Sequence, residues 1–535
     1  MITTVLLVTS ILLLLAYRYY GRFLERRFGI DDTRPTPAET ENDGVDYVPT
    51  STPVLFGHHF SSIAGAGPIV GPIVAASAFG WGPAWLWVLV GAVFVGGVHD
   101  LGSTVVSLRH KGHSIIEAFR SLVGGPAARV MFAFVFLAMI YVIIVFLDLT
   151  ASGFLATPAV ATASGWFVLV AFAFGAAVRF TRLPHWLLVT VFILLTYLGL
   201  AIGYWFPAPA VGKEVWIVAV LAYCFLAAIL PVNVLLQPRD FLSATFLYAI
   251  MLLGIVGALI TGGDFSMPVY TGFESKELGL LVPFLFISVA CGACSGFHSM
   301  VCSGTTAKQL RRETDARKVA FGGMLVEALL ATFAIACVAM AGGLEGNAVT
   351  TFARGAAVFF GALGIPQELG IVFASLAVST FLLTTLDTCV RLGRFLVEES
   401  FGWRGPASRY GVTLLIVIVT GVLVMQKYTN IKGELVPAWQ ALWPLFGATN
   451  QLLAALALVT VAVFLRSRGI PSAFAFVPAA IMVAMPVSAF IIMAFDQHLD
   501  WFQRGASAVQ VVLGVFIILM AARFLIGARK APSEV

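Results

Sequence analysis

The stretch from Phe56 to Pro72, which reads FGHHFSSIAGAGPIVGP, holds the residues whose types and spacing best suit chemistry. His58 and His59 are adjacent, and because a histidine titrates near physiological pH, either can accept a proton. Ser61 and Ser62 follow within one turn and offer hydroxyls to a carboxylate or a carbonyl. The alternatives are a neutral histidine that donates to a backbone carbonyl and serines that only join helices. We expect the histidines to carry a proton and the serines to bind a substrate.

The glycines and prolines of this stretch predict a break in a membrane helix. Pro68 and Pro72 each remove a backbone donor, and Gly65 and Gly67 allow an unwound conformation at low cost. Such backbone persists at membrane depth only where protein buries it or a watery cavity solvates it. The free N–H groups of Gly65 and Gly67 can then bind an anion, and the ends of the two half-helices add their dipoles. We therefore expect both glycines in a substrate site.

Composition places this break in an all-α polytopic membrane protein. Of the 535 residues, 60% are hydrophobic and only 11% are charged, and the mean hydropathy is +0.96. A soluble globular protein is far less apolar. The length allows about fifteen spans of roughly 20 residues each. The predicted spans lie near 2–20, 54–78, 82–108, 127–153, 158–178, 184–206, 214–236, 240–262, 280–304, 317–342, 368–390, 408–426, 438–465, 473–495 and 506–526.

The basic residues predict the orientation of the chain. With the N-terminus outside, cytoplasmic segments hold every Lys and Arg except Lys213, Lys276, Arg354, Lys427, Lys432 and Arg504. The positive-inside rule then predicts an external N-terminus and a cytoplasmic C-terminus. The pI near 8.9 follows from these cytoplasmic segments, so we expect no nucleic-acid partner. The polar segment from Arg22 to Pro53 is expected to be a cytoplasmic linker.

A second interruption is predicted between Ala228 and Asp240, where Pro231 falls deep in a span beside Asn233. This span lies five spans after the first broken one and crosses the membrane in the opposite direction. Two five-helix units that face opposite ways are typical of inverted-repeat transporters. The alternative is that Pro231 only kinks a helix, and Asn233 is a candidate substrate ligand in either case. We predict an extra N-terminal helix with its linker (1–53), a first repeat (54–212), a second, inverted repeat (213–392) and flanking helices (393–535).

Another polar constellation surrounds His298 in the predicted span 280–304. It contains Ser303, Thr305 and Thr306. A charge at the centre of a membrane helix costs about 2.5–3.5 kcal/mol, so titratable residues there mark candidate functional sites. We expect these four residues to serve a coupling ion. The alternative is that the SGTT sequence is only a helix end that enters the cytoplasm before Lys308.

Acidic residues in the spans rank below the histidines. Asp100 is a candidate for proton coupling, but a structural ion pair with the nearby Arg109 is the favoured interpretation. Asp148 lies toward the outer end of its predicted helix, and Glu327 lies one to two turns inside the cytoplasmic face. Single carboxylates near helix ends often reach interfacial water, so neither is our first candidate.

Amides and cysteines add weaker signals. Asn450 and Gln451 are expected to break a late span, and Asn450 is either a substrate ligand or a structural residue. Cys291 and Cys294 form a CxxC, but the small residues around them indicate a close helix-packing face. A zinc site that adds His298 lacks a clear fourth ligand. We expect no metal and no cofactor, and the sequence contains no nucleotide-binding loop that would indicate a primary pump.

Five segments resemble the signature blocks of the carbon starvation protein A family: HHFSSIAGAGPIVGP (58–72), PVNVLLQPRD (231–240), SGFHSMVCSGTTAKQ (295–309), LDTCVRLGRFLVEE (386–399) and WPLFGATNQLLAALAL (443–458). The resemblance implies bacterial or archaeal inner-membrane carriers that take up peptides or pyruvate, generally as proton symporters. It also implies a leucine-transporter-like core of the amino acid–polyamine–organocation superfamily, with two inverted five-helix repeats. In that fold, the helix that corresponds to 280–304 supplies hydroxyls to a sodium site, so sodium stays open as the coupling ion.

These features predict a secondary active transporter in a lipid bilayer rather than an enzyme. The solute is expected near the break at 58–72, and His58, His59 or His298 is expected to carry the proton. The alternatives are a sodium-coupled carrier of another small carboxylate and a membrane channel or sensor. A channel would need a filter repeated by oligomerisation, and an enzyme would need catalytic groups gathered at one membrane face.

Overall fold

The computed structural model describes residues 1–44, 47–123, 125–230, 235–344, 346–403, 405–429 and 434–527. Within these ranges, eleven helices are long and apolar enough to cross a membrane, and a bent pair of shorter helices adds a twelfth. The only strands described are two short antiparallel pairs in loops. The prediction of an all-α polytopic membrane protein is therefore confirmed, whereas the expected number of about fifteen spans stays a prediction.

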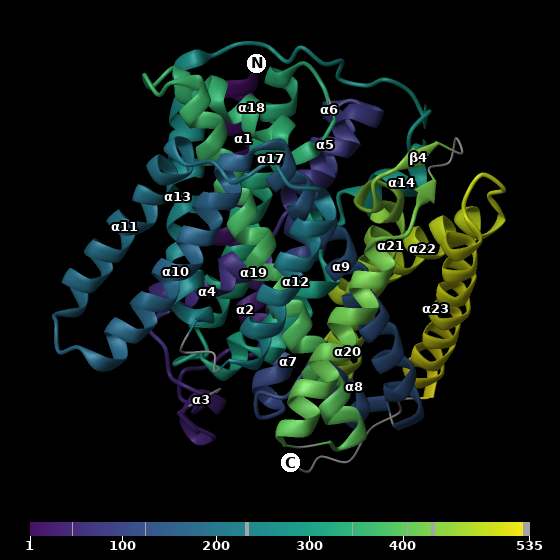
Figure 1. Ribbon diagram of the computed structural model, residues 1–535. Coiled ribbons are helices and arrows are strands. Elements are labelled where there is room, and N and C mark those ends of the chain that lie inside the picture. The colour runs from purple at the N-terminus through teal and green to yellow at the C-terminus, as the bar shows by residue number, and fades with distance from the viewer. Residues whose placement is uncertain are drawn as a thin grey trace.

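The first half of the chain holds the first broken helix and the hairpin that projects at the left of Figure 1. Short π-helical turns, Ala16–Tyr20 and Ala92–Gly96, join α1 to α2 and α6 to α7 into continuous rods. The elements are α1 (Ile2–Leu15), α2 (Gly21–Phe28), α3 (Pro37–Thr40), α4 (Thr52–Ile63), α5 (Gly67–Phe79), α6 (Trp81–Gly91), α7 (Gly97–Arg109), α8 (Ile115–Val123), α9 (Gly125–Ala156), α10 (Pro158–Phe180), α11 (His185–Trp205) and α12 (Lys213–Ile229).

The second half holds the longest helices. A 3₁₀ turn (Thr306–Lys308) follows α16, and a π-helical turn (Arg317–Phe321) leads into α17. The elements are α13 (Leu236–Thr261), β1 (Glu274–Ser275), β2 (Gly279–Leu280), α14 (Leu281–Ser288), α15 (Ala290–Ala293), α16 (Gly296–Gly304), α17 (Gly322–Ala341), α18 (Ala348–Gly361), α19 (Gln367–Phe401), α20 (Pro406–Val424), β3 (Tyr428–Thr429), β4 (Leu435–Val436), α21 (Ala438–Ser467), α22 (Ala473–Phe495) and α23 (Trp501–Gly527).

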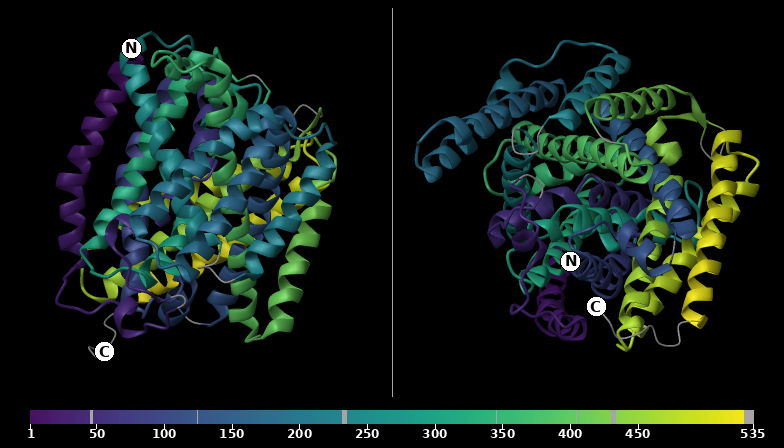
Figure 2. Two further views of the ribbon diagram at one scale, coloured as in Figure 1. Left: turned by 60° about the vertical axis from the view of Figure 1, so that its left-hand side comes forward. Right: turned by 90° about the horizontal axis from the view of Figure 1, so that it is seen from below.

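Burial separates a core from a periphery. The most apolar 18-residue segment of α21 is completely buried, and that of α19 is 89% buried. The corresponding segment of α11 is only 22% buried. Viewed along the bundle, α10 and α11 project from one side and α23 lies at another edge (Figure 2). Peripheral helices of this kind face lipid, because apolar side chains on their outer faces have no protein to contact.

The predicted break in the first stretch is confirmed. Helices α4 and α5 meet at an angle of 44°, and the residues between them, 64–66, are not helical. Pro68 lies in the first turn of α5, where a backbone N–H has no helical partner in any case. The glycines and prolines of this stretch thus end α4 and begin α5.

The span predicted at 280–304 is wrong in one respect, because it is not a continuous helix. It consists of α14, α15 and α16, which are interrupted at Val289 and again at Cys294 and Ser295. This second broken helix runs antiparallel to the first: the N–H of Thr271, in the loop before α14, donates to the carbonyl of Phe79 at the end of α5. At the other end, β-type contacts join 48–50 to 308–310.

Glycines let the two broken helices touch. A Cβ added at Gly67 would lie 2.4 Å from the Cys291 sulfur, and one added at Gly71 would lie 2.2 Å from the carbonyl oxygen of Ser288. Neither distance is tolerable for a side chain, so only glycine permits this approach. The small residues around the CxxC therefore pack closely on several neighbours: Cys291 lies against the first broken helix, and Ala293 lies against Gly91 at the end of α6.

The sequence also predicts interruptions around Pro231 and Asn233 and at Asn450 and Gln451. The predicted interruption around Pro231 and Asn233 lies outside the described residues, which stop at 230 and resume at 235. The expectation that Asn450 and Gln451 break a late span is wrong, since α21 runs through both as one helix of 30 residues. The four predicted segments, 1–53, 54–212, 213–392 and 393–535, stay predictions.

Candidate functional site

A cavity of about 640 Å³ borders the first broken helix. His58 and Ser62 of α4 and Thr305 after α16 line its inner part, and the exposed Trp403 lies at its outer part. It therefore leads from the broken helix to the end of the bundle that lies away from Met1. A cavity of this volume is large enough for a ligand of drug size.

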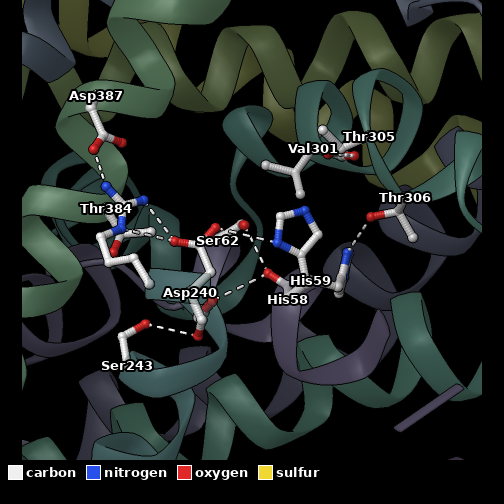
Figure 3. Close-up of polar contacts among 12 residues, drawn as sticks. His58, His59, Ser62, Asp240, Ser243, Val301, Thr305, Thr306, Thr384 and Asp387 are labelled. Carbon is white, nitrogen blue, oxygen red and sulfur yellow. Dashed lines mark hydrogen bonds and ion pairs between the residues drawn. The ribbon is translucent and has the colours of Figure 1, made fainter. Parts of the chain in front are cut away.

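A buried arginine cluster lies behind one wall of this cavity. His58 Nδ1 is 3.2 Å from Asp240 Oδ2, and Asp240 Oδ1 is 2.6 Å from Arg239 Nη2. Arg239 also pairs with Asp387 of α19, and it donates to the Tyr223 hydroxyl of α12 at 2.7 Å. Arg239, Asp240 and Asp387 are almost completely buried, so each charge needs the others to be tolerated there. Figure 3 shows His58 on the side of Asp240.

The serines and glycines at the break are closely packed in this conformation. The Ser62 hydroxyl donates to the His58 carbonyl at 2.8 Å, and the Ser61 hydroxyl lies 3.3 Å from the same oxygen. The Gly65 N–H donates to a backbone carbonyl, and a Cβ added there would lie 2.7 Å from Thr385 Oγ1. The space beside Gly65 and Gly67 measures only about 10 Å³. The cavity that can hold a solute therefore begins at Ser62. The close packing at Gly65 and Gly67 leaves no such space farther along the chain, toward α5.

A second charge cluster joins three helices in the core. His99 Nδ1 and Asp100 Oδ1 of α7 are 2.7 Å apart, and Asp100 Oδ2 is 3.0 Å from His298 Nδ1 of α16. On its other side, His298 Nε2 lies 3.3 Å from Glu327 Oε2 of α17. All four side chains are fully buried. The expected ion pair between Asp100 and Arg109 is wrong, since Arg109 pairs with Glu313.

His59 lies between the cavity and this second cluster. Its Nδ1 is 2.8 Å from the Thr306 hydroxyl, on the opposite side of α4 from Asp240 (Figure 3). Its Nε2 would lie 3.2 Å from a Cβ added at Gly323, one turn before Glu327. The two adjacent histidines thus face different clusters, which their position in one sequence motif does not reveal.

The remaining candidates have structural contacts. The Ser303 hydroxyl donates to the Ser299 carbonyl at 2.6 Å and accepts the N–H of Ile115. Asn450 Oδ1 accepts the N–H of Phe297 at 3.0 Å, in the first turn of α16. Helix ends need such partners, so Asn450 stabilises the second break from outside. Asn233 lies outside the described residues.

Within the described ranges, no three or more His, Cys, Asp and Glu side chains are grouped so as to hold a metal ion. Cys291 lies 3.3 Å from the Asn450 amide nitrogen, and His298 is occupied by its two carboxylates. Cys291, Cys294 and His298 therefore do not form the zinc site that their sequence spacing suggested.

Comparison with known proteins identifies the family. The family model described as carbon starvation protein CstA matches residues 1–344 and 340–489. The chain belongs to the CstA family. The peptide transporter CstA of Escherichia coli K12 is 33% identical over 534 residues, which cover 84% of this chain and 75% of that protein. The pyruvate/proton symporter BtsT of the same organism is 31% identical over 541 residues, with 83% and 75% covered. These relatives are transporters rather than enzymes.

Solved structures show a weaker likeness. An Eremococcus coleocola manganese transporter mutant covers 90% of this chain and 99% of its own length, with 12% identity and a TM-score of 0.48. The transporter MhsT in complex with L-phenylalanine covers 88% and 99%, with 14% identity and a TM-score of 0.44.

The CstA-family blocks converge around the two broken helices. The blocks at 58–72 and 295–309 contribute the broken helices themselves, and the block at 443–458 contributes Asn450. The block at 231–240 ends with Asp240, and the block at 386–399 has Asp387 as its second residue. Both aspartates belong to the arginine cluster. Segments spread over most of the chain thus meet at one place.

The arginine cluster was not predicted from the sequence, although Arg239 and Asp240 lie in the family block 231–240 and Asp387 lies in the block 386–399. The signal was present: Arg239 and Asp240 are adjacent charges at the start of a helix that reaches the core, and Asp387 lies in the middle of a long apolar helix. Charges in such positions must pair, because each one alone is costly in a membrane. Their partners are far apart in sequence, so only the fold identifies the pairs.

Proposed function

We propose that this chain is a secondary active transporter that takes up peptides, pyruvate or both, driven by protons. The observation that carries the proposal is a solute-sized cavity at a broken helix, walled by a histidine that belongs to a buried charge cluster. The printed names of the CstA-family relatives support the two solute classes and the proton. The buried, paired charges favour coupling to an ion over passive conduction.

The solute is placed in the cavity beside His58 and Ser62, below the closed space at Gly65 and Gly67. The cavity wall includes the cations Lys308 and Arg391 and the anions Asp240 and Glu398. A carboxylate can therefore meet positive charge, and a peptide amine can meet negative charge, within one space. Ser61 and Asn450 contribute by supporting the two breaks.

The proton path is placed along the histidines, with His58 in contact with the cavity and His59 and His298 deeper in the protein. Asp100 holds His298, and Thr306 holds His59. Sodium is less favoured at Ser303, because its hydroxyl oxygen already accepts the N–H of Ile115 while it donates to the Ser299 carbonyl. A sodium-coupled carrier, a channel and a sensor are the alternatives that the experiment below distinguishes.

The membrane placement follows from the basic residues. The N-terminus is placed outside and the C-terminus in the cytoplasm of a bacterial or archaeal inner membrane. The cavity then opens to the cytoplasm, and the broken helices close the outer side. Two inverted repeats, 54–212 and 213–392, are part of the proposal, and each contains one of the two antiparallel broken helices, in the first span of the first repeat and the third span of the second.

Energetics decide which gradient must act. One proton that falls through about 100 mV releases roughly 2.3 kcal/mol, enough for about a fifty-fold gradient of a neutral or zwitterionic solute. An anion that enters with one proton moves no net charge. Pyruvate must therefore depend on the pH difference, whereas a zwitterionic peptide can use the voltage as well.

The test is uptake of labelled pyruvate and of a labelled dipeptide into proteoliposomes, with pH, sodium and voltage gradients imposed one at a time. We expect accumulation with an inward proton gradient and none with a sodium gradient alone. Accumulation driven only by sodium would favour the sodium carrier. Downhill flux that no gradient can concentrate would favour a channel, and absence of uptake by folded protein would favour a sensor.

A further inference from the structure

The cluster of His99, Asp100, His298 and Glu327 is short of positive charge. With both imidazoles neutral its net charge is −2, and a proton on His298 between the two carboxylates leaves −1. The cluster becomes neutral only when it binds one more positive charge. An uncompensated charge in a fully buried position is strongly unfavourable, so the cluster must bind a cation in part of its cycle.

Within the cluster, the missing charge belongs at Glu327. Asp100 is complete, because its two oxygens lie 2.7 Å and 3.0 Å from His99 and His298. Glu327 Oε2 is 3.3 Å from His298 Nε2 but without hydrogen-bond geometry, and neither Glu327 oxygen has a hydrogen bond within the described part of the chain. A buried carboxylate in that position is the group of the cluster most ready to bind a proton.

The groups around Glu327 suit a proton better than a metal cation. Those that interact with it are His298 from α16, Asp100 from α7, and Cys291 and Cys294 at the second break. His59 from α4 lies against Gly323, one turn before Glu327. Sodium, like other hard cations, needs several oxygen ligands, and these neighbours offer mostly nitrogen and sulfur. A proton needs only one carboxylate oxygen.

His59 provides a path from Glu327 toward the cavity. Gly323 and Glu327 are four residues apart and share one face of α17. The Nε2 of His59 lies against Gly323, and its Nδ1 contacts Thr306, whose neighbour Thr305 lines the cavity. His59 Nε2 has no hydrogen bond among the described residues, so it is available on the Glu327 side.

We propose that Glu327 is the residue that binds and releases the coupling proton, that His298 and Asp100 form the fixed charge pair that positions it, and that His59 passes the proton to the cytoplasmic cavity. The coupling role rests on the proposed function. When Glu327 is protonated the cluster is neutral, which favours the closed packing of α7, α16 and α17. Loss of the proton leaves the cluster charged and favours a conformation that admits water or solute.

The transport test compares net accumulation with exchange. For Glu327→Gln we expect accumulation driven by a pH gradient to fall at least tenfold, while exchange of external labelled solute for internal unlabelled solute persists, because exchange needs no net proton release. Glu327→Asp is expected to restore part of the accumulation. The control is Glu117→Gln on α8, a partly exposed residue whose nearest cation, Arg120, is 3.5 Å away. Unchanged accumulation by Glu327→Gln would overturn the proposal.

A second measurement does not depend on transport. Infrared difference spectra of the purified protein between acidic and alkaline pH report the C=O stretch of protonated carboxylic acids. We expect a band from a buried acid that is present in the wild type and in Glu117→Gln and absent in Glu327→Gln. An identical band in Glu327→Gln would refute proton binding at Glu327. A band that behaves as expected in a protein without uptake would instead refute the transport function.

Discussion

Arg239 and its partners form a charge cluster that is one positive charge short of neutrality, as the cluster around His298 is once His298 carries a proton. Asp240 and Asp387 carry two negative charges, and the guanidinium carries one positive charge. A proton on His58, 3.2 Å from Asp240, makes the cluster neutral. Because His58 also lines the cavity, its protonation strengthens the contact between α4 and α13 next to the solute.

Removal of one carboxylate from this cluster tests its energetic role. For Asp387→Ala we expect a loss of about 1–3 kcal/mol in the free energy of unfolding, because the Tyr223 hydroxyl and one Arg239 nitrogen lose a buried acceptor while Asp240 still pairs with the guanidinium. The measurement is unfolding of the purified protein in detergent, followed by tryptophan fluorescence.

A matched control is Asp264→Ala, which removes an exposed ion pair with the N-terminal amine. We expect a loss of less than about 1 kcal/mol there, since exposed pairs contribute little. Equal stability of Asp387→Ala and Asp264→Ala would mean that the contacts of Asp387 with Arg239 and Tyr223 do not stabilise the fold.

At the scale of elements, the contact between two broken helices organises the site. Backbone of α5 lies directly against backbone of α14, and the helix ends that this exposes are satisfied from α21, through Asn450 to Phe297 and Gln451 to Phe286. Such backbone is tolerated in a membrane because protein buries it and provides partners. The continuous helix α21 therefore acts as a support for the second break.

The close approach predicts a strong effect of one added methyl group. For Gly71→Ala we expect a loss of about 1–3 kcal/mol in the free energy of unfolding, because the Cβ would lie 2.2 Å from a backbone oxygen that cannot rotate away. Gly165→Ala on α10 is the control, since a Cβ there meets no atom within 4 Å. A Gly71→Ala protein as stable as Gly165→Ala would show that the two half-helices are not in contact.

The sequence predicts the first break and misses the second for a physical reason. Pro68, Pro72 and several glycines indicate the first break, because proline removes a backbone N–H donor and glycine allows non-helical backbone conformations. The second break has no proline at its interruptions, and its small residues fit helix packing equally well. Its helix ends are stabilised by Asn450, which is 153 residues away from Phe297, and no local pattern reports such a partner.

The same limit explains the outcome for the charged residues. Histidines in a membrane span are rare enough to be identified as candidates, and the structure places His298 in a charge cluster. Its partner Asp100 is 198 residues away, so sequence proximity suggested Arg109 instead. Pairing of distant charges depends on how the helices pack, which one sequence does not contain.

At the scale of the whole molecule, the cavity lies on one side of the closed contact between the broken helices. It reaches the surface at the end of the bundle away from Met1, whereas the space at the break is nearly filled. A carrier must expose its site to one side at a time, and with the proposed orientation this arrangement corresponds to a conformation open to the cytoplasm.

Accessibility from each side tests that placement. We expect Thr305→Cys to react with a membrane-impermeant maleimide only from the cytoplasmic side, and more slowly when solute is present. All six native cysteines are buried, so the background is expected to be low. Val269→Cys, an exposed position in the loop before β1, is the control that reacts only from outside. Reaction of Thr305→Cys from outside alone would reverse the proposed orientation.

The central claim is that solute and proton move together, and the most direct measurement is proton flux caused by solute. Proteoliposomes are placed in weakly buffered medium without any imposed gradient, and the external pH is recorded when a dipeptide or pyruvate is added. We predict that the medium becomes more alkaline with the wild type and that Glu327→Gln produces no change although it still exchanges solute. Solute entry into wild-type vesicles without any change in external pH would contradict proton coupling.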